Sequence, residues 1–188
     1  MKIISLHHNE KALIKKAVAA NRDAQRIIYE KYAPKMLSVC RQYIKDVQFA
    51  EDIMINGFVK VFKHLDSFKY QGSFEGWIRK IMVREAISYL RKKQFVVFDD
   101  EVYENNASEH VSFDVDLDVE RIQRLIDQLP EGYKMVFVMY AVEGYRHNEI
   151  AEMLQISEGT SKSQLFKARR ALQEKLSLKE ISGQSASQ

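Results

Sequence analysis

Apolar residues recur at intervals of three and four along most of this chain, a pattern that predicts amphipathic helices. In the first half, helices are expected at residues 10–20, 23–44, 50–65 and 74–93. Asp23 and Ser73 are suited to cap the second and fourth, and Pro34 predicts a bend or a fresh start near Tyr32. The side chains expected to face the core are Leu13, Ile14, Ala17, Val18, Ile27, Ile28, Met36, Leu37, Cys40, Tyr43, Ile53, Met54, Phe58, Val61, Phe62, Trp77, Ile78, Ile81, Met82, Ile87 and Leu90.

The second half predicts four shorter helices. One covers residues 119–128, and the next ends at Gly144, which is suited to be its C-cap. The other two lie in residues 146–176, where a short break precedes Ser157, a good N-cap for the last helix. Two helices joined by so short a break form a helix-turn-helix. Core candidates here are Ile122, Leu125, Ile126, Ile150, Ala151, Leu154, Leu165, Ala168, Leu172 and Leu176.

The opposite face of the last helix is polar and cationic. It carries Lys162, Ser163, Gln164, Phe166, Lys167, Arg169 and Arg170. Positive charges and hydrogen-bond donors on one face suit a helix that lies in the major groove of DNA. The alternative interpretation is a pair of packed helices with a solvated basic face.

A second candidate nucleic-acid site lies at residues 66–73, DSFKYQGS, just before a basic helix. Aromatic faces can stack bases while nearby cations follow the backbone of a single strand. Phe74 and Trp77 are expected to be core residues instead. For Lys69 and Tyr70, at the loop tip, a binding role and a plain surface role both stay open.

Charge is unevenly distributed along the chain, although its formal net charge is only +3. Residues 95–120 contain no Lys or Arg, and their acids are Asp99, Asp100, Glu101, Glu104, Glu109, Asp114, Asp116, Asp118 and Glu120. The rest of the chain is therefore strongly basic, which favours a polyanionic partner. We interpret the acidic stretch as a linker, with plain solubility as the alternative.

The remaining composition argues against catalysis. The single cysteine, Cys40, has no disulfide or metal partner and fits a reducing cytoplasm. We expect neither a signal peptide nor a membrane span. The histidines lack metal-ligand spacing and no glycine-rich phosphate loop occurs, so we expect no enzyme, no cofactor and no bound metal.

The chain resembles the extracytoplasmic-function (ECF) sigma factors, the smallest bacterial transcription initiation factors, in two segments: LDSFKYQGSFEGWIRKIMVREAISYLRK and LPEGYKMVFVMYAVEGYRHNEIAEMLQISEGTSKSQLFKARRALQEKL. The resemblance implies an all-α fold of two helical domains joined by an acidic flexible linker. Residues 1–95 would dock on core RNA polymerase and melt the promoter's minus-ten element. Residues 96–118 would be the linker, 119–178 the helix-turn-helix domain that reads the minus-thirty-five element, and 179–188 a disordered tail.

The resemblance also implies roles for individual residues. Those matched to polymerase binding are Glu51, Asp52 and Asn56. Those matched to the melted strand are Ser67, Phe68, Lys69, Tyr70, Gln71, Trp77, Lys80 and Arg84. Those matched to the upstream element are Gly159, Thr160, Lys162, Ser163, Phe166, Lys167, Arg169 and Arg170. The acidic linker would occupy the positively charged polymerase channel that later holds RNA.

The chain departs from the family pattern at several positions. Ile55-Asn56 stands for the frequent Gln-Glu, Arg84 for Asn, Arg146 for a capping Ser, Gln155 for a turn Gly and Ser161 for a core Val. The partners implied are core RNA polymerase, promoter DNA and an anti-sigma factor, without membrane insertion. Judged from the residues alone, a stand-alone helix-turn-helix regulator and a helical interaction adaptor remain alternatives.

Overall fold

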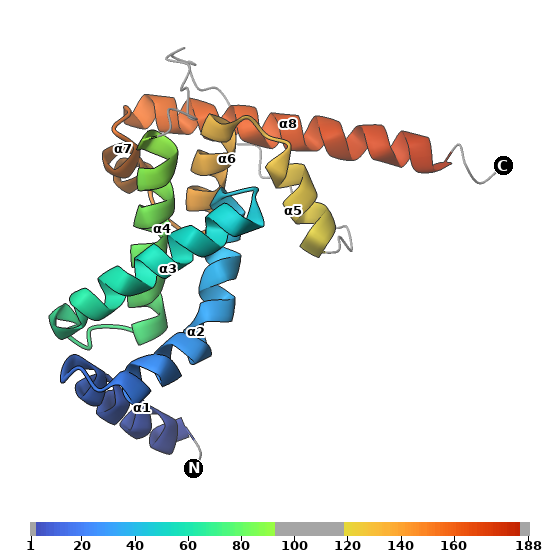
Figure 1. The fold of residues 1–188 in the computed structure, drawn as a ribbon. Helices are drawn as coiled ribbons and strands as arrows, with labels where there is room; N and C mark the ends of the chain where they lie inside the picture. Colours follow the sequence, from blue (N-terminus) through green and yellow to red (C-terminus); the bar gives the residue numbers. More distant parts are fainter. Residues whose placement is uncertain (1–2, 93–118, 185–188) are drawn as a thin grey trace. The chain divides into compact units, whose positions relative to one another are not determined.

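The computed structural model describes the backbone of residues 3–92 and 119–184, and the side chains of residues 10–92 and 121–176. Every regular element in these ranges is helical, which confirms the predicted all-α class. The predicted linker, residues 96–118, lies outside the described residues. The chain forms two compact units, residues 1–89 (unit 1) and 90–188 (unit 2), each described by itself below (Figure 1).

Unit 1 contains four helices and one 3₁₀ turn. They are α1 (Ile3–Val18), α2 (Arg22–Tyr43), α3 (Val47–Lys63), the turn η1 (Leu65–Ser67) and α4 (Phe74–Lys92). The predicted cap of α4 is confirmed, because the Ser73 hydroxyl accepts the Gly76 N–H at 3.1 Å. The predicted cap of α2 is wrong. Asn21, in an extended conformation, caps this helix by accepting the Ala24 N–H at 2.8 Å.

The core of unit 1 is formed largely by the residues that the apolar pattern predicted. Ile28, Met36, Ile78 and Met82 are fully buried. Two core predictions are wrong, since Ile27 is 45% exposed and Val18 is 46% exposed. α2 runs through Pro34 as one helix, so the predicted fresh start does not occur.

Ion pairs join neighbouring helices of unit 1. Lys31 Nζ lies 2.7 Å from Glu10 Oε1 of α1, and Lys60 Nζ of α3 lies 2.5 Å from Glu85 Oε1 of α4. The Met82 side chain of α4 packs over Gly57 of α3, where a Cβ would lie only 2.3 Å from Met82 Sδ. The missing side chain of Gly57 therefore leaves room for Met82.

Unit 2 contains α5 (Val119–Asp127), α6 (Glu131–Phe137), a π-helical turn η2 (Val138–Val142), α7 (His147–Leu154) and α8 (Glu158–Gln184). Its core includes a cluster of Leu125, Leu129, Ala168 and Leu172. The buried Lys134 places its ammonium 2.7 Å from Asp127 Oδ1 and so ties α6 to α5. Gly144 has a φ of +76°, as the predicted C-cap requires.

Three features of unit 2 differ from the sequence prediction. Ile122 was expected in the core but is 40% exposed. The helix before Gly144 ends in a π-helical turn, in which the Glu143 N–H donates to the Val138 carbonyl at 3.0 Å. α8 continues to Gln184, into the segment that was predicted to be a disordered tail. Within the described part of the chain, no helix has both the length and the apolar character needed to cross a membrane.

Candidate nucleic-acid interface

Helices α7 and α8 form the helix-turn-helix that the sequence predicted. The Ile156 N–H donates to the Ala151 carbonyl at 3.0 Å and ends α7, and Gln155 adopts a left-handed φ of +58°. This conformation explains why a glycine is usual at that position. Ser157 caps α8 as predicted, because its hydroxyl accepts the Thr160 N–H at 2.9 Å.

α7 begins without a capping hydroxyl. Arg146 occupies the N-cap position, and its backbone N–H donates to Glu149 Oε2 at 2.8 Å. This contact supplies the carboxylate half of a capping box. The helix start thus tolerates an arginine where a serine is usual.

The candidate DNA-reading residues of α8 are not equally exposed. Exposed ones are Gly159, Lys162, Phe166, Arg169 and Arg170, and Lys167 is half-buried. Thr160 is 8% exposed and Ser163 is 3% exposed. The hydroxyl of Ser163 donates to the Thr160 carbonyl at 3.0 Å. The exposed cations and Phe166 therefore make up most of the surface that this helix offers to a ligand.

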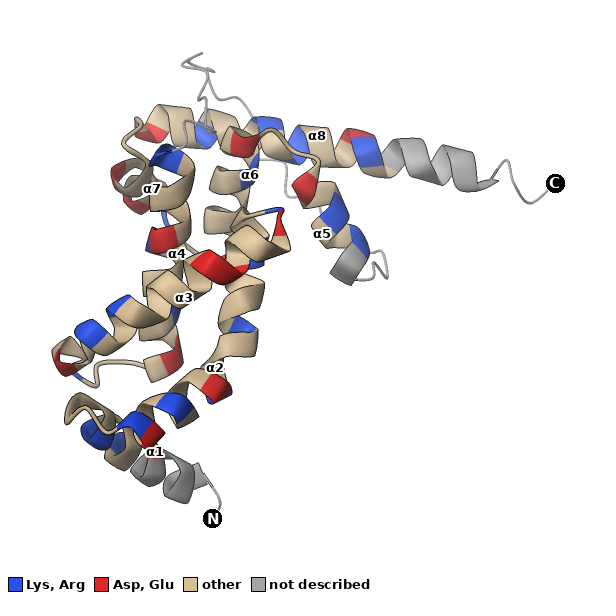
Figure 2. Cartoon of the chain, viewed as in Figure 1, with Lys and Arg blue, Asp and Glu red and all other residues tan. Residues whose placement is uncertain are grey.

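The two arginines of this face have partners on the protein. The Arg169 guanidinium lies 5.8 Å from the centre of the Tyr140 ring, and Arg170 Nε lies 3.0 Å from Glu174 Oε1. Both are exposed, so these contacts orient the side chains without removing them from solvent. Lys and Arg residues recur along the described part of α8 (Figure 2).

A polar pair behind this face was not foreseen. The fully buried Ser161 places its Oγ 2.9 Å from Nδ1 of His147, whose ring stacks on Tyr140 with centroids 4.7 Å apart. Burial lowers the pKa of His147, the positive charges of Lys162 and Arg169 lower it further, and Glu158 opposes them. The only signal in the sequence was Ser161 itself, a hydroxyl on an apolar stripe.

In unit 1, the 66–73 loop presents an aromatic cluster. The ring of Phe68 lies 4.9 Å from that of Tyr70, 5.1 Å from that of Phe74 and 5.5 Å from that of Trp77. Phe68 and Phe74 are buried, Trp77 is half-buried, and Tyr70 is 43% exposed. The core interpretation of Phe74 is confirmed, and Tyr70 is the ring that the loop exposes.

The loop tip has an unusual backbone. Tyr70 has a φ of +57° and Gly72 a φ of +103°. The left-handed region is unfavourable for an aromatic residue, so surrounding contacts must hold Tyr70 in it. Of the other strand-binding candidates, Ser67, Lys69, Gln71, Lys80 and Arg84 are exposed.

A pocket of about 450 Å³ opens between the loop and helices α1 and α2. Tyr70, Phe68 and Phe74 line it from the loop and the start of α4, and Lys11, Ile14, Lys31 and Tyr32 line it from the other two helices. Aromatic and cationic groups therefore meet in one concave surface. The contribution of α1 to this surface was not predicted.

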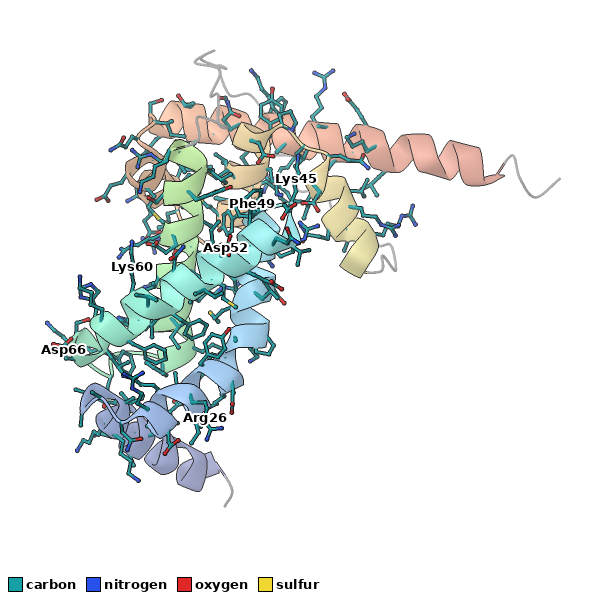
Figure 3. The ribbon with its side chains drawn as sticks, in the orientation of Figure 1. Arg26, Lys45, Phe49, Asp52, Lys60 and Asp66 are labelled. Atoms are coloured by element: carbon teal, nitrogen blue, oxygen red, sulfur yellow. The ribbon has the colours of Figure 1, made fainter. Side chains whose placement is uncertain are left out.

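The outer face of α3 carries the residues matched to polymerase binding. Glu51, Asp52 and Asn56 are all exposed, and Asp52 is labelled on this helix in Figure 3. Ile55 and Val59 are 48% and 61% exposed, one helical turn apart. These two apolar side chains were not predicted as functional. Their i, i+4 spacing beside the acids was the available signal.

Helix-turn-helix geometry with exposed cations on its second helix defines a class of DNA-binding proteins. Models of two segments of one family match the chain: "Sigma-70 region 2" at residues 28–96 and "Sigma-70, region 4" at residues 119–172. The chain belongs to the sigma-70 family, as an ECF sigma factor. The predicted family is thus confirmed, and α1 lies outside both matched segments.

Similar curated proteins cover almost the whole chain. The ECF RNA polymerase sigma factor SigW of Bacillus subtilis is 27% identical over 180 residues, which are 88% of this chain and 96% of SigW. The RNA polymerase sigma-H factor of Pseudomonas aeruginosa is 24% identical over 89% of this chain and 93% of its own length. The ECF RNA polymerase sigma-E factor of Escherichia coli is 24% identical over 89% of this chain and 94% of its own length.

Two solved structures share the fold. The sigma factor RpoE of Bartonella quintana, in complex with the anti-sigma factor NepR, has a TM-score of 0.53 at 22% identity, over 81% of this chain and 96% of that one. CnrH, in complex with the cytosolic domain of CnrY, has a TM-score of 0.50 at 17% identity. The match covers 90% of this chain and 97% of CnrH.

Proposed function

We propose that this chain binds core RNA polymerase in the cytoplasm and directs it to promoters through two separate DNA-reading sites. The exposed face of α8 reads the upstream, minus-thirty-five element in the major groove. The 66–73 loop and the basic face of α4 capture the melted minus-ten strand. The outer face of α3 docks on polymerase. The chain itself carries out no catalytic step.

One observation carries the proposal. Each unit exposes a different kind of nucleic-acid surface: cations and Phe166 on a helix in unit 2, and Tyr70 on a loop in unit 1. A cationic helix face suits duplex DNA, whereas an exposed ring beside cations suits unstacked bases. A protein that needs both surfaces acts where a duplex is first recognised and then opened.

The docking role of α3 rests on its mixed surface. The exposed apolar residues Ile55 and Val59 occur on α3 together with the exposed polar residues Glu51, Asp52 and Asn56. Apolar side chains rimmed by polar groups are typical of protein interfaces. We propose an anti-sigma factor as a further partner, since RpoE and CnrH were solved with partners of their own.

Transcription by purified core RNA polymerase, with and without the full chain, on a library of promoter sequences tests this function. The chain should cause initiation only from templates that share both an upstream and a minus-ten sequence. Without polymerase, it should show no specific binding to duplex DNA.

Two outcomes would contradict the proposal. Specific binding to a palindrome without polymerase would indicate a stand-alone regulator. Failure to bind DNA or to initiate with any polymerase would indicate an interaction adaptor.

A further inference from the structure

Helix α1 lies against the loop that we assign to strand capture. It packs against α2 and against η1, the turn that leads into this loop. Ile14 of α1 is 2% exposed and lines the same pocket as Phe68 and Tyr70. α1 therefore forms one wall of the concave surface whose other wall is the loop.

Glu10, near the middle of α1, joins this helix to α2. Glu10 Oε1 accepts hydrogen bonds from the Tyr32 hydroxyl and, at 2.7 Å, from Lys31 Nζ. Burial lowers the pKa of Lys31, but its hydrogen bonds to Glu10 and Tyr32 outweigh this effect and raise the pKa above its ordinary value. The Lys31 ammonium therefore stays charged and keeps its bond to Glu10. Because Glu10 is anchored to α2, the position of the next residue, Lys11, is restricted as well.

Lys11 reaches the loop tip. Its Nζ lies 5.2 Å from the centre of the Tyr70 ring, within the range of a cation–π contact. The Tyr70 ring also contacts Phe68, with ring centroids 4.9 Å apart. The ring thus has a cation of α1 and a buried aromatic residue as neighbours, at a residue whose φ is +57°.

We propose that Lys11 is a positioning residue for strand capture, which holds Tyr70 in the left-handed conformation that the exposed tip requires. The inference rests on the proposed function, which it deepens by adding a residue of α1 to the minus-ten site. Lys11 acts through Tyr70. Removing its charge therefore changes which base the loop prefers, while initiation from the best promoter continues.

The test measures minus-ten base preference with core RNA polymerase and full-length variants on a library that varies each minus-ten position. Lys11→Gln should reduce the ratio between the preferred base and its competitors by about two- to five-fold, the size of one exposed cation–π contact. Lys11→Arg keeps a cation over the ring and should restore the ratio. Lys16→Gln removes an exposed lysine elsewhere on α1 and should match the wild type.

A double-mutant cycle separates positioning from direct DNA contact. In a Tyr70→Asn background, which keeps a residue that tolerates the left-handed backbone, Lys11→Gln should have no further effect on base preference, because the ring through which Lys11 acts is gone. An equal effect in both backgrounds would overturn the inference and make Lys11 a direct DNA contact. An unchanged preference in Lys11→Gln, with an active wild type, would also overturn it. A wild type that never initiates would instead contradict the proposed function itself.

Discussion

At the scale of the residue, the helix-turn-helix contains a polar pair, His147 and Ser161. A buried hydroxyl among apolar side chains costs free energy unless it is hydrogen-bonded, and His147 Nδ1 at 2.9 Å supplies the partner. Tyr140 then stacks on His147 and meets Arg169 on its ring. The pair therefore links the start of α7 to the exposed cationic face of α8.

Because the pKa of His147 is lowered in the folded protein, the stability of the protein should depend on pH. The unfolded chain takes up this proton near the ordinary value of 6.5, while the folded chain resists it until lower pH. The stabilisation is complete above that value and is lost as the pH falls towards the folded pKa. Between about pH 7.5 and pH 5, the Tm of the wild-type chain should therefore decrease more than the Tm of the His147→Asn variant, as measured by thermal unfolding.

The wild type and the His147→Asn variant share the four other histidines, so the difference between their curves of Tm against pH isolates His147. Parallel pH curves would contradict the assignment.

Residue exposure was predictable only where the helical spacing decides it. Ile27 and Ile28 were both expected in the core, but neighbours on a helix point about 100° apart, and only Ile28 is buried. The left-handed backbone of Tyr70 was not predictable, because no local preference favours it in an aromatic residue. The contact that Tyr70 makes with Lys11 of α1, far away in the sequence, was not predictable either.

At the scale of the element, the caps show what local chemistry can decide. Ser73 and Ser157 were predicted and are confirmed, since each hydroxyl accepts an N–H of the first turn. The prediction of Asp23 as a cap was wrong, because the side chain of Asn21, two residues earlier, accepts the first-turn N–H instead. The π-helical turn in Val138–Val142 had no sequence signal, since side-chain periodicity alone does not reveal a change in the backbone hydrogen bonds.

The packing of Met82 over Gly57 predicts a destabilising effect of a larger residue at this position. In an open helix, Gly→Ala gains up to about 1 kcal/mol of stability. Here the new Cβ would lie 2.3 Å from Met82 Sδ, so the end of the Met82 side chain must shift within a buried site. Gly57→Ala should therefore lower the free energy of unfolding by about 1–3 kcal/mol in chemical denaturation.

A matched change checks that this penalty is steric. Gly159→Ala, in a helix where the nearest atom would lie at 3.5 Å, should cause no such loss. Met82→Ala removes the obstacle, so adding Gly57→Ala to it should no longer destabilise the protein. Additive losses in the double variant would show that the contact with Met82 is not the cause.

At the scale of the whole molecule, the order of features along the chain indicated both the fold and the function. Helical periodicity with a short break before Ser157 predicted the helix-turn-helix, and the structure confirms it. The sequence also located the 66–73 loop as a candidate site, but it did not indicate the pocket beside it, which α1 and α2 complete. Such a surface is formed by tertiary packing of segments that are distant in the sequence, so local sequence motifs do not predict it.

We propose that two separate surfaces of this protein, the 66–73 loop and the exposed face of α8, read two promoter elements. The most direct test is one transcription experiment with core RNA polymerase on a library in which both elements vary, using two variants and their combination. The loop variant combines Lys69→Ala, Tyr70→Asn and Gln71→Ala, because Asn tolerates the left-handed backbone. The helix variant is Lys167→Glu, with Lys175→Glu on the same helix as its control.

The loop variant should change preference at the minus-ten element alone. Lys167→Glu should weaken use of the upstream element by about tenfold or more and leave minus-ten preference intact, while Lys175→Glu behaves as the wild type. The combined variant should show both defects. If either variant altered both preferences, or if neither altered any, the two surfaces would not be the readers and the account would be contradicted.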